Sequence, residues 1–446
     1  MKLAYGVNDK PKFGQMIVFA FQQLLAILAA TIAVPAIIGN GMSSSAALFG
    51  AGVGTIVYQL FTKFRSPVFL GSSFAFISSM FAAFAGAATT AGGYAGIILG
   101  AVLAGLVYVV IALVVKFAGV NWINKLMPAV VIGPTVAIIG LSLAGNAVGD
   151  LFVGKVVDEN LVSVANPYIT FICGLVTLFT VIICSVYGKK MMKLIPFIIG
   201  ILAGYVVAAI FTVIGNVTDN AALQIINFAA FKEMQIFAIP DFTFISGIKG
   251  ISKINGSYVA TVAVAYIPVA FVVFAEHIAD HKNLSSIIDK DLLEEPGLHR
   301  TLLGDGVGSM AGAFFGGCPN TTYGESVGCV AITGNASVVT ITTTAIMAMV
   351  ISFFGPFVTF LASIPNCVMG GVCITLYGFI AVSGLKMIQK VDLNQNKNLF
   401  VVAVILISGI GGLTLTFGKV TLTAVACALI LGIITNLIVS PKKDEE

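Results

Sequence analysis

Apolar residues recur along the chain in runs of about 20, the length of helix that crosses the hydrocarbon core of a bilayer. Strands of a membrane β-barrel are shorter and alternate in polarity, and open sheets cannot span lipid. The pattern therefore predicts an all-α polytopic membrane protein with about fourteen transmembrane segments. The predicted segments are 13–38, 46–63, 67–84, 94–116, 126–148, 168–187, 194–214, 266–286, 300–316, 319–333, 337–361, 366–383, 398–417 and 420–439.

Composition and charge agree with this pattern. Only 9% of the 446 residues are charged, against about 25% in a soluble domain. An even number of crossings places both termini on one side, and lysine and arginine concentrate on the cytoplasmic side. With the N-terminus inside, only five of the 23 basic residues fall outside: Lys155, Lys232, Lys249, Lys253 and Lys419. We therefore expect both termini to be cytoplasmic.

Two pairs of short motifs recur at an offset of seven segments. SPVFLGSSF (66–74) opens the third segment and CPNTTYGES (318–326) the tenth, while PAVVIG (128–133) lies in the fifth and PNCVMG (365–370) in the twelfth. Because seven is odd, the second copy enters the membrane from the opposite side, as in inverted repeats with discontinuous segments. The sequence predicts a 7+7 inverted repeat with short strands in segments 3 and 10.

The tenth segment is predicted to have a broken backbone. Extended residues 320–323 would expose amide and carbonyl groups at membrane depth, which is tolerated only where protein or a cavity satisfies them. We expect the strands of segments 3 and 10 to pair with each other. Gly324 permits close approach of a ligand, and a half-helix beginning near Glu325 directs amide groups into the same space.

Carboxylates inside a membrane are costly and usually functional. The candidates are Glu276, Asp280, Asp305 and Glu325. Glu276 and Asp280 lie four residues apart, on one face of a helix. Because proline favours the first helical turn, Pro268 predicts that this helix runs from about residue 266 to 286, which places both acids at mid-membrane.

Each acid also has a structural interpretation. Glu276 would then pair with a buried cation, although no lysine or arginine occurs in the neighbouring apolar segments. Lys282 leaves open that Asp280 lies close to the cytosol, and Asp305, between glycines, is open to a role in capping a tight helix contact. His277 and His281 lie four residues apart, but we do not expect a metal there.

Two carboxylates and the amides of two half-helices suit a planar ring whose edge alternates N–H and C=O groups. An inorganic anion would be repelled by Glu276 and Glu325. No P-loop and no metal, nucleotide or nucleophile constellation is present in the sequence, so we expect neither ATP-driven transport nor an enzyme. No cofactor and no nucleic-acid partner are expected.

Several motifs resemble those of the nucleobase–ascorbate transporter family, most closely the bacterial uracil and xanthine permeases. They are LGSSFAFIS (70–78), AEH (275–277), EPGLHR (295–300), PNTTYGE (319–325), VMGGV (368–372) and LYG (376–378). The resemblance covers nearly the whole chain. It implies proton-coupled nucleobase uptake in a bacterial plasma membrane, usually by a homodimer embedded in lipid. It also implies a core domain (13–116 and 258–361) that moves against a gate domain (126–214 and 366–439).

The same resemblance suggests roles for individual residues. Glu276 and Glu325 match the substrate-binding glutamates of the family, and Phe74 matches an aromatic residue beside the substrate. Ser73, Tyr323 and Gly324 would contribute backbone or shape. Asp280, with Asp305 and Glu276, would carry the coupled proton, because burial of a carboxylate favours its neutral form.

Three positions depart from the family pattern. The signature [Q/E]-N-x-G-x-x-x-x-T-[R/K/G] reads ESVGCVAITG (325–334), with Ser326 in place of asparagine. Gln23 stands where many members have histidine, and it cannot relay a proton. Asp280 replaces the histidine of similar uracil permeases and is typical of purine and xanthine members. The motifs PNTTYGE and AEH favour uracil, whereas Asp280 favours a purine. We expect a uracil:proton importer, with a xanthine or guanine:proton symporter as the alternative and an anion transporter of the same architecture as a third.

Overall fold

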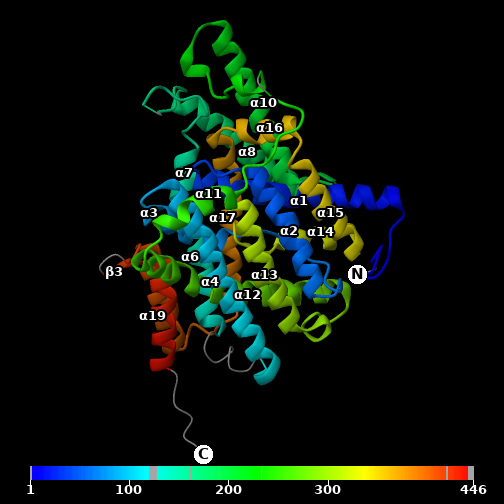
Figure 1. The fold of residues 1–446 in the computed structure, drawn as a ribbon, viewed down its shortest axis with the longest axis vertical. Coiled ribbons are helices and arrows are strands. Elements are labelled where there is room, and N and C mark those ends of the chain that lie inside the picture. The colour runs from blue at the N-terminus through cyan, green and yellow to red at the C-terminus, as the bar shows by residue number, and fades with distance from the viewer. Residues whose placement is uncertain are drawn as a thin grey trace, which may run out of the picture.

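A computed structural model of the chain describes residues 3–119, 128–160, 162–189, 191–232, 234–417 and 420–439 (Figure 1). The elements of the first half are α1 (Phe13–Ile38), α2 (Ser44–Phe61), β1 (Leu70–Ser72), η1 (Phe74–Phe76), α3 (Ile77–Ala85), α4 (Thr90–Ala118), α6 (Ala129–Ser142), α7 (Ala144–Asp150), α8 (Pro167–Tyr187), α9 (Met191–Leu194) and α10 (Pro196–Val217). A connection with the short helices η2 (Ala221–Leu223), η3 (Ala229–Phe231), α11 (Thr243–Gly250) and η4 (Ile251–Lys253) follows.

The second half begins with one long helix. Its elements are α12 (Gly256–Ile288), η5 (Leu293–Gly297), α13 (Leu298–Gly316), β2 (Asn320–Thr322), α14 (Gly324–Thr333), α15 (Val338–Ile351), α16 (Gly355–Ser363), α17 (Asn366–Ile388), α18 (Asn396–Ile410), β3 (Leu415–Phe417), β4 (Val420–Leu422) and α19 (Ala424–Val439). Each predicted segment thus contains helix, but several are short or broken.

Eight helical stretches in the described part of the chain are long and apolar enough to cross a membrane. They are α1, α2, α4, α6 with α7, α8, α10, α12 and α17. The prediction of an all-α polytopic membrane protein is confirmed. The count of fourteen crossings stays a prediction, because α3, α14, α15, α18 and α19 are each shorter than a full span.

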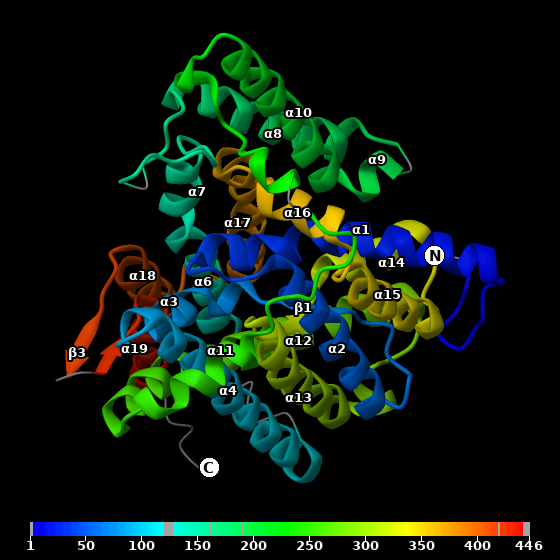
Figure 2. The same cartoon turned by 45° about the horizontal axis from the view of Figure 1, so that its top comes forward.

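The helices pack in two groups. In the first, α2 and α4 pack on α13, α12 packs on α4, and α1 packs on α14 and α15. In the second, α17 packs on α6 and α8, with α10, α18 and α19 around them. Figure 2 shows α8 and α10 at one end of the molecule and α4 and α13 towards the other, with α6 and α17 between them.

The two broken segments meet in the interior through their strands. β1 and β2 pair antiparallel, with Leu70 opposite Thr322 and Ser72 opposite Asn320. Two further backbone hydrogen bonds extend the pair, from Ser73 N to Pro319 O (2.9 Å) and from Tyr323 N to Phe69 O (3.3 Å). The prediction of short strands in segments 3 and 10 is confirmed, and each strand satisfies backbone groups of the other at a depth without water.

A second antiparallel pair was not predicted. β3 pairs with β4, with Leu415 opposite Leu422, so the ends of two segments predicted as helix are strands. Their sequences, LTLTF and VTLT, alternate apolar residues with threonine and are rich in β-branched side chains, which favour strands.

The predicted start of the eighth segment is wrong. The helix begins at Gly256, ten residues earlier than expected, because the side chain of Asn255 caps it by accepting from Tyr258 N at 2.9 Å. Pro268 lies in its interior, where it removes one backbone donor. The turn before Pro268 receives a donor from a neighbouring helix instead: Ser79 Oγ of α3 donates to Ala265 O at 2.7 Å.

Close packing of α2 on α13 depends on glycine. A Cβ atom on Gly54 would lie 2.8 Å from Gly308 O and 2.5 Å from Asn320 Nδ2. Asn320 Nδ2 donates to Gly50 O at 3.1 Å, so the same contact fixes the start of β2.

We therefore expect Gly54→Ala to lower the free energy of unfolding by about 1–3 kcal/mol through overpacking. The melting temperature of the purified protein in detergent measures this. Gly378→Ala is the control, because no atom lies within 4 Å of a Cβ at that position. Equal melting temperatures for the two variants would contradict the packing assignment.

Candidate functional site

A cavity of about 410 Å³ lies between the two helix groups. One side, the polar wall, is made by the β1–α3 junction, α12 and the β2–α14 junction; its residues are Ser73, Phe74, Ala75, Glu276, Asp280, Thr321, Thr322, Tyr323, Gly324 and Glu325. The other side, the apolar wall, comes from α6, α10 and α17; its residues are Val136, Ile139, Phe197, Leu376, Phe379, Ile380, Ser383 and Met387. All six predicted substrate-binding residues line this cavity, and Asp280 lines it too.

The β2–α14 junction turns the backbone towards the cavity. Tyr323 is extended (φ −106°, ψ 120°), and the helix begins at Gly324, so Glu325 falls in its first turn, where the amides have no intrahelical partner. No atom lies within 4 Å of a Cβ placed on Gly324, which leaves its backbone open to the cavity. The Tyr323 hydroxyl donates to Ser72 O at 2.8 Å and ties α14 to β1.

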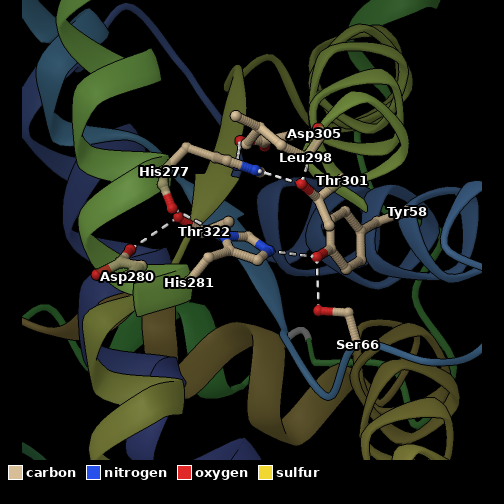
Figure 3. A network of polar contacts seen from close by, with 9 residues as sticks. All are labelled: Tyr58, Ser66, His277, Asp280, His281, Leu298, Thr301, Asp305 and Thr322. Carbon is tan, nitrogen blue, oxygen red and sulfur yellow. Dashed lines mark hydrogen bonds and ion pairs between the residues drawn. The ribbon is translucent and has the colours of Figure 1, made fainter. Parts of the chain in front are cut away.

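Helix α12 contributes two carboxylates to the polar wall. Glu276 and Asp280 are both half-buried and face the same space, as their spacing predicted. Thr322 Oγ1 donates to Asp280 Oδ2 at 2.7 Å, which joins α12 to strand β2 (Figure 3). In the part of the chain that the structure describes, no lysine or arginine lines the cavity beside its three carboxylates.

Phe74 is the aromatic residue of the polar wall. It lies in η1, directly after β1, and its ring meets Tyr377 of α17 edge to face, with centroids 6.0 Å apart and an angle of 77°. This contact crosses from one helix group to the other. Apart from Ser383, the apolar wall offers no side-chain polar group to the cavity.

Asp305 does not line the cavity. It is fully buried on α13 behind α12, where its Oδ2 lies 2.7 Å from His277 Nδ1. The other ring nitrogen of His277 lies 2.9 Å from Thr301 Oγ1, and the Thr301 hydroxyl donates to Leu298 O at 3.0 Å. Sequence reasoning considered His277 only as a metal ligand and missed this contact, since nothing in the spacing relates residues 277 and 305.

His281 belongs to the same buried cluster (Figure 3). Its ring stacks on that of His277 with centroids 4.0 Å apart, and its Nδ1 donates to His277 O at 2.8 Å. Its Nε2 lies 2.7 Å from the hydroxyl of Tyr58, which lies 2.7 Å from Ser66 Oγ. The histidines follow the two acids by one residue each, so they occupy the face of α12 turned away from the cavity.

Two of the departures from the family pattern are in contact. The amide of Gln23 in α1 donates to Ser326 Oγ at 2.6 Å, and Phe69 N donates to the same oxygen at 3.3 Å. Both side chains are buried. Ser326 therefore joins α14 to α1 and to the residue preceding β1.

Ser326→Ala is expected to lower the free energy of unfolding by about 1–3 kcal/mol, because two buried donors lose their acceptor. Thermal unfolding in detergent measures the change. Ser286→Ala is the control, since that exposed hydroxyl donates only to Asn283 O, near the end of α12. If the two variants have the same melting temperature, the Gln23–Ser326 hydrogen bond contributes nothing to stability.

The long apolar helices and the cavity between two helix groups define a multi-pass membrane transport protein. Residues 14–418 match the sequence model of the Permease family, and the chain belongs to that family. The uracil permease of Bacillus caldolyticus is 39% identical over 435 residues, which cover 97% of this chain and 94% of that protein. The uracil permease of Escherichia coli (strain K12) is 33% identical, covering 98% of this chain and 94% of that protein. The relatives are permeases, not enzymes.

Two solved structures share the fold. The transmembrane domain of the cyanobacterial bicarbonate transporter BicA has a TM-score of 0.62 at 17% identity and covers 96% of this chain and 99% of its own. The murine anion transporter Slc26a9 has a TM-score of 0.65 at 13% identity and covers 97% and 69%. At these identities the likeness establishes the fold alone.

Proposed function

We propose that this protein imports a nucleobase, uracil above all, together with a proton, by alternating access across a bacterial plasma membrane. The observation that carries the proposal is the cavity itself, which places Glu276, Glu325 and the open backbone at Gly324 around a space suited to one small ring. The near full-length similarity to proteins named uracil permease supports the choice of base.

Substrate recognition follows from the donors and acceptors of the polar wall. Glu276 accepts from a ring N–H group, and Glu325 accepts from the opposite edge of the ring. The free amides at the start of α14, around Tyr323 and Gly324, donate to a ring carbonyl. Phe74 and Ser73 flank the ring and fix its plane.

Anion transport, the third expectation, does not suit this site despite the shared fold. Glu276, Asp280 and Glu325 all face the cavity, and no lysine or arginine lines it. An inorganic anion would be repelled there unless the acids were neutral. A neutral base with N–H donors uses the same carboxylates as hydrogen-bond acceptors.

Proton coupling is assigned to the cavity carboxylates. Asp280 lies one helical turn from Glu276 and accepts a hydrogen bond from Thr322. It therefore lines the substrate cavity and also contacts strand β2. Protonation of one acid reduces the repulsion among three neighbouring carboxylates and lets the loaded site cross the membrane with less charge. A proton gradient thereby drives accumulation of the base.

Alternating access follows from the unequal walls of the cavity. The polar wall belongs to the proposed core (13–116 and 258–361), and the apolar wall to the proposed gate (126–214 and 366–439). A bound base makes its hydrogen bonds to the core only, so the core can carry it past the apolar gate without breaking them. We assign both termini to the cytoplasm and expect fourteen segments, a 7+7 inverted repeat and a homodimer.

The test is uptake of radiolabelled uracil into proteoliposomes under an imposed proton gradient, with and without a protonophore. We expect concentrative uptake that the protonophore abolishes and that unlabelled uracil competes away. Stronger competition by xanthine or guanine would transfer the assignment to the purine alternative. Bicarbonate transport without any response to nucleobases would overturn the proposal.

A further inference from the structure

A second, much smaller space lies behind the cavity. It is a void of about 10 Å³ between α4, α12, α13 and β2, and its lining includes Tyr108, Asp305, Ser309, Asn320 and Thr321. A volume of this size holds about one water molecule when several polar groups surround it.

Three buried polar atoms along this void have no hydrogen-bond partner among the described residues: Tyr108 Oη, Asp305 Oδ1 and Asn320 Oδ1. The amide nitrogen of Asn320 already donates to Gly50 O at 3.1 Å, so its oxygen is left as the acceptor. Buried polar groups are costly unless they are hydrogen-bonded. One water molecule can donate to Asp305 and Asn320 while it accepts from Tyr108, which satisfies all three atoms.

The void and the substrate cavity share one residue. Thr321, the central residue of β2, lines both spaces. Its neighbour Thr322 holds Asp280 on the cavity side. Thr321 is thus the residue that borders both the void and the cavity with the carboxylates of the polar wall.

The hydrogen bonds around His277 fix how many protons the pair with Asp305 holds. Thr301 Oγ1 donates its proton to Leu298 O, so it can only accept from His277, whose Nε2 is therefore protonated (Figure 3). The 2.7 Å contact between His277 Nδ1 and Asp305 Oδ2 then needs one more proton between the two atoms. With that proton the pair is neutral overall, and both side chains are fully buried.

Asp305 Oδ1 is the carboxylate oxygen that has no hydrogen-bond partner among the described residues, so it is the oxygen open to a further proton. The titratable groups around the pair and the void are Glu276, Asp280 and His281 of α12, Tyr58 of α2, Tyr108 of α4, and Tyr323 and Glu325 of the β2–α14 junction. The lysine of α4, Lys116, and the arginine of α13, Arg300, lie at helix ends. Among the described residues no lysine or arginine lines either space, and the ionisable groups of the two linings include the carboxyl groups of Glu276, Asp280, Asp305 and Glu325.

We propose that the void binds one water molecule, and that this water exchanges a proton between the substrate cavity and Asp305 Oδ1. On loading, a proton from the cavity reaches the water by way of Thr321, and the water passes one of its own protons to Oδ1. The pair then consists of a carboxylic acid and an imidazolium, and the cavity carboxylates offset the added positive charge. On release the same transfers run in reverse. This inference rests on the proposed proton symport.

The test uses proteoliposomes and two uptake assays. Counterflow of uracil without a gradient measures binding and the movement between states, whereas accumulation driven by a pH gradient also needs the proton. We expect Tyr108→Phe, a change that lies outside the substrate cavity, to retain counterflow and to lose at least about tenfold in gradient-driven accumulation, as removal of a group that assists proton transfer does. Tyr266→Phe is the control, because it removes another buried, unpartnered hydroxyl away from the void.

Gradient-driven accumulation at the parent level in Tyr108→Phe would overturn the proton link. If the parent shows counterflow but no accumulation, the proposed symport fails, and that result is separate from any difference between variants. A structure at a resolution that shows ordered water tests the site directly, including for variants that lose both activities. We expect one water within hydrogen-bond distance of Tyr108, Asp305 and Asn320, and an empty void in the parent would overturn the site.

Discussion

Replacing Glu276 with glutamine is expected to abolish concentrative uptake of the base. The change keeps the shape of the side chain but replaces one carboxylate oxygen by an NH₂ group. Two hydrogen-bond donors, this NH₂ group and the ring N–H group, then face each other. A hydrogen bond to a charged acceptor contributes about 1.5–3 kcal/mol, so affinity should fall by about 10- to 100-fold from that loss alone. Thermal-shift titration with uracil measures binding, and radiolabel uptake measures transport.

Glu325→Gln is expected to behave in the same way, because Glu325 lines the same cavity. Glu294→Gln is the matched control: Glu294 is exposed in the short segment before α13 and lies outside the cavity. Unchanged proton-driven uptake by Glu276→Gln would remove Glu276 from the site.

Asp280→Asn is expected to separate exchange from accumulation. Asparagine still accepts from Thr322 through its Oδ1, so the link from α12 to β2 is kept. It cannot take up a proton in the physiological pH range, so a proton gradient cannot drive transport through protonation of this side chain. Counterflow of uracil should persist, while accumulation and its rise with falling external pH should be lost.

The control for this second variant is Asp289→Asn, an exposed carboxylate just beyond the end of α12 whose left-handed backbone (φ 54°) asparagine adopts readily. A purified Asp280→Asn protein that still accumulates uracil against a gradient would assign the coupled proton elsewhere. The His277–Asp305 pair would then take up the coupled proton without Asp280.

Much of the site was predictable because its chemistry is concentrated in short motifs. The extended residues after Pro319, the glycine at 324 and the spacing of Glu276 and Asp280 each predicted a local feature. The constant offset between motifs then indicated which segments meet. The structure shows the strands paired and these side chains around one cavity.

The rest depended on contacts that no local pattern encodes. Pro268 predicted a helix start, but a capping asparagine and a donor from another helix allow the proline to lie inside α12. Gln23 and Ser326 were separate departures in the sequence and are hydrogen-bonded in the fold, 303 positions apart. His277 could be related to Asp305 only after α12 and α13 had been placed side by side.

Strand pairing also constrains the order in which the chain becomes a folded protein. Among the described residues, β2 is the strand that pairs with β1, although the Thr55 side chain of α2 also bonds Leu70 N and O. The tyrosine bond that supports the strand pair joins residues 251 positions apart. During synthesis from the N-terminus, β1 is therefore made before the strand that pairs with it. Pairing of β2 with β1 orders both broken segments together, so the substrate site forms only after β2 has been synthesised.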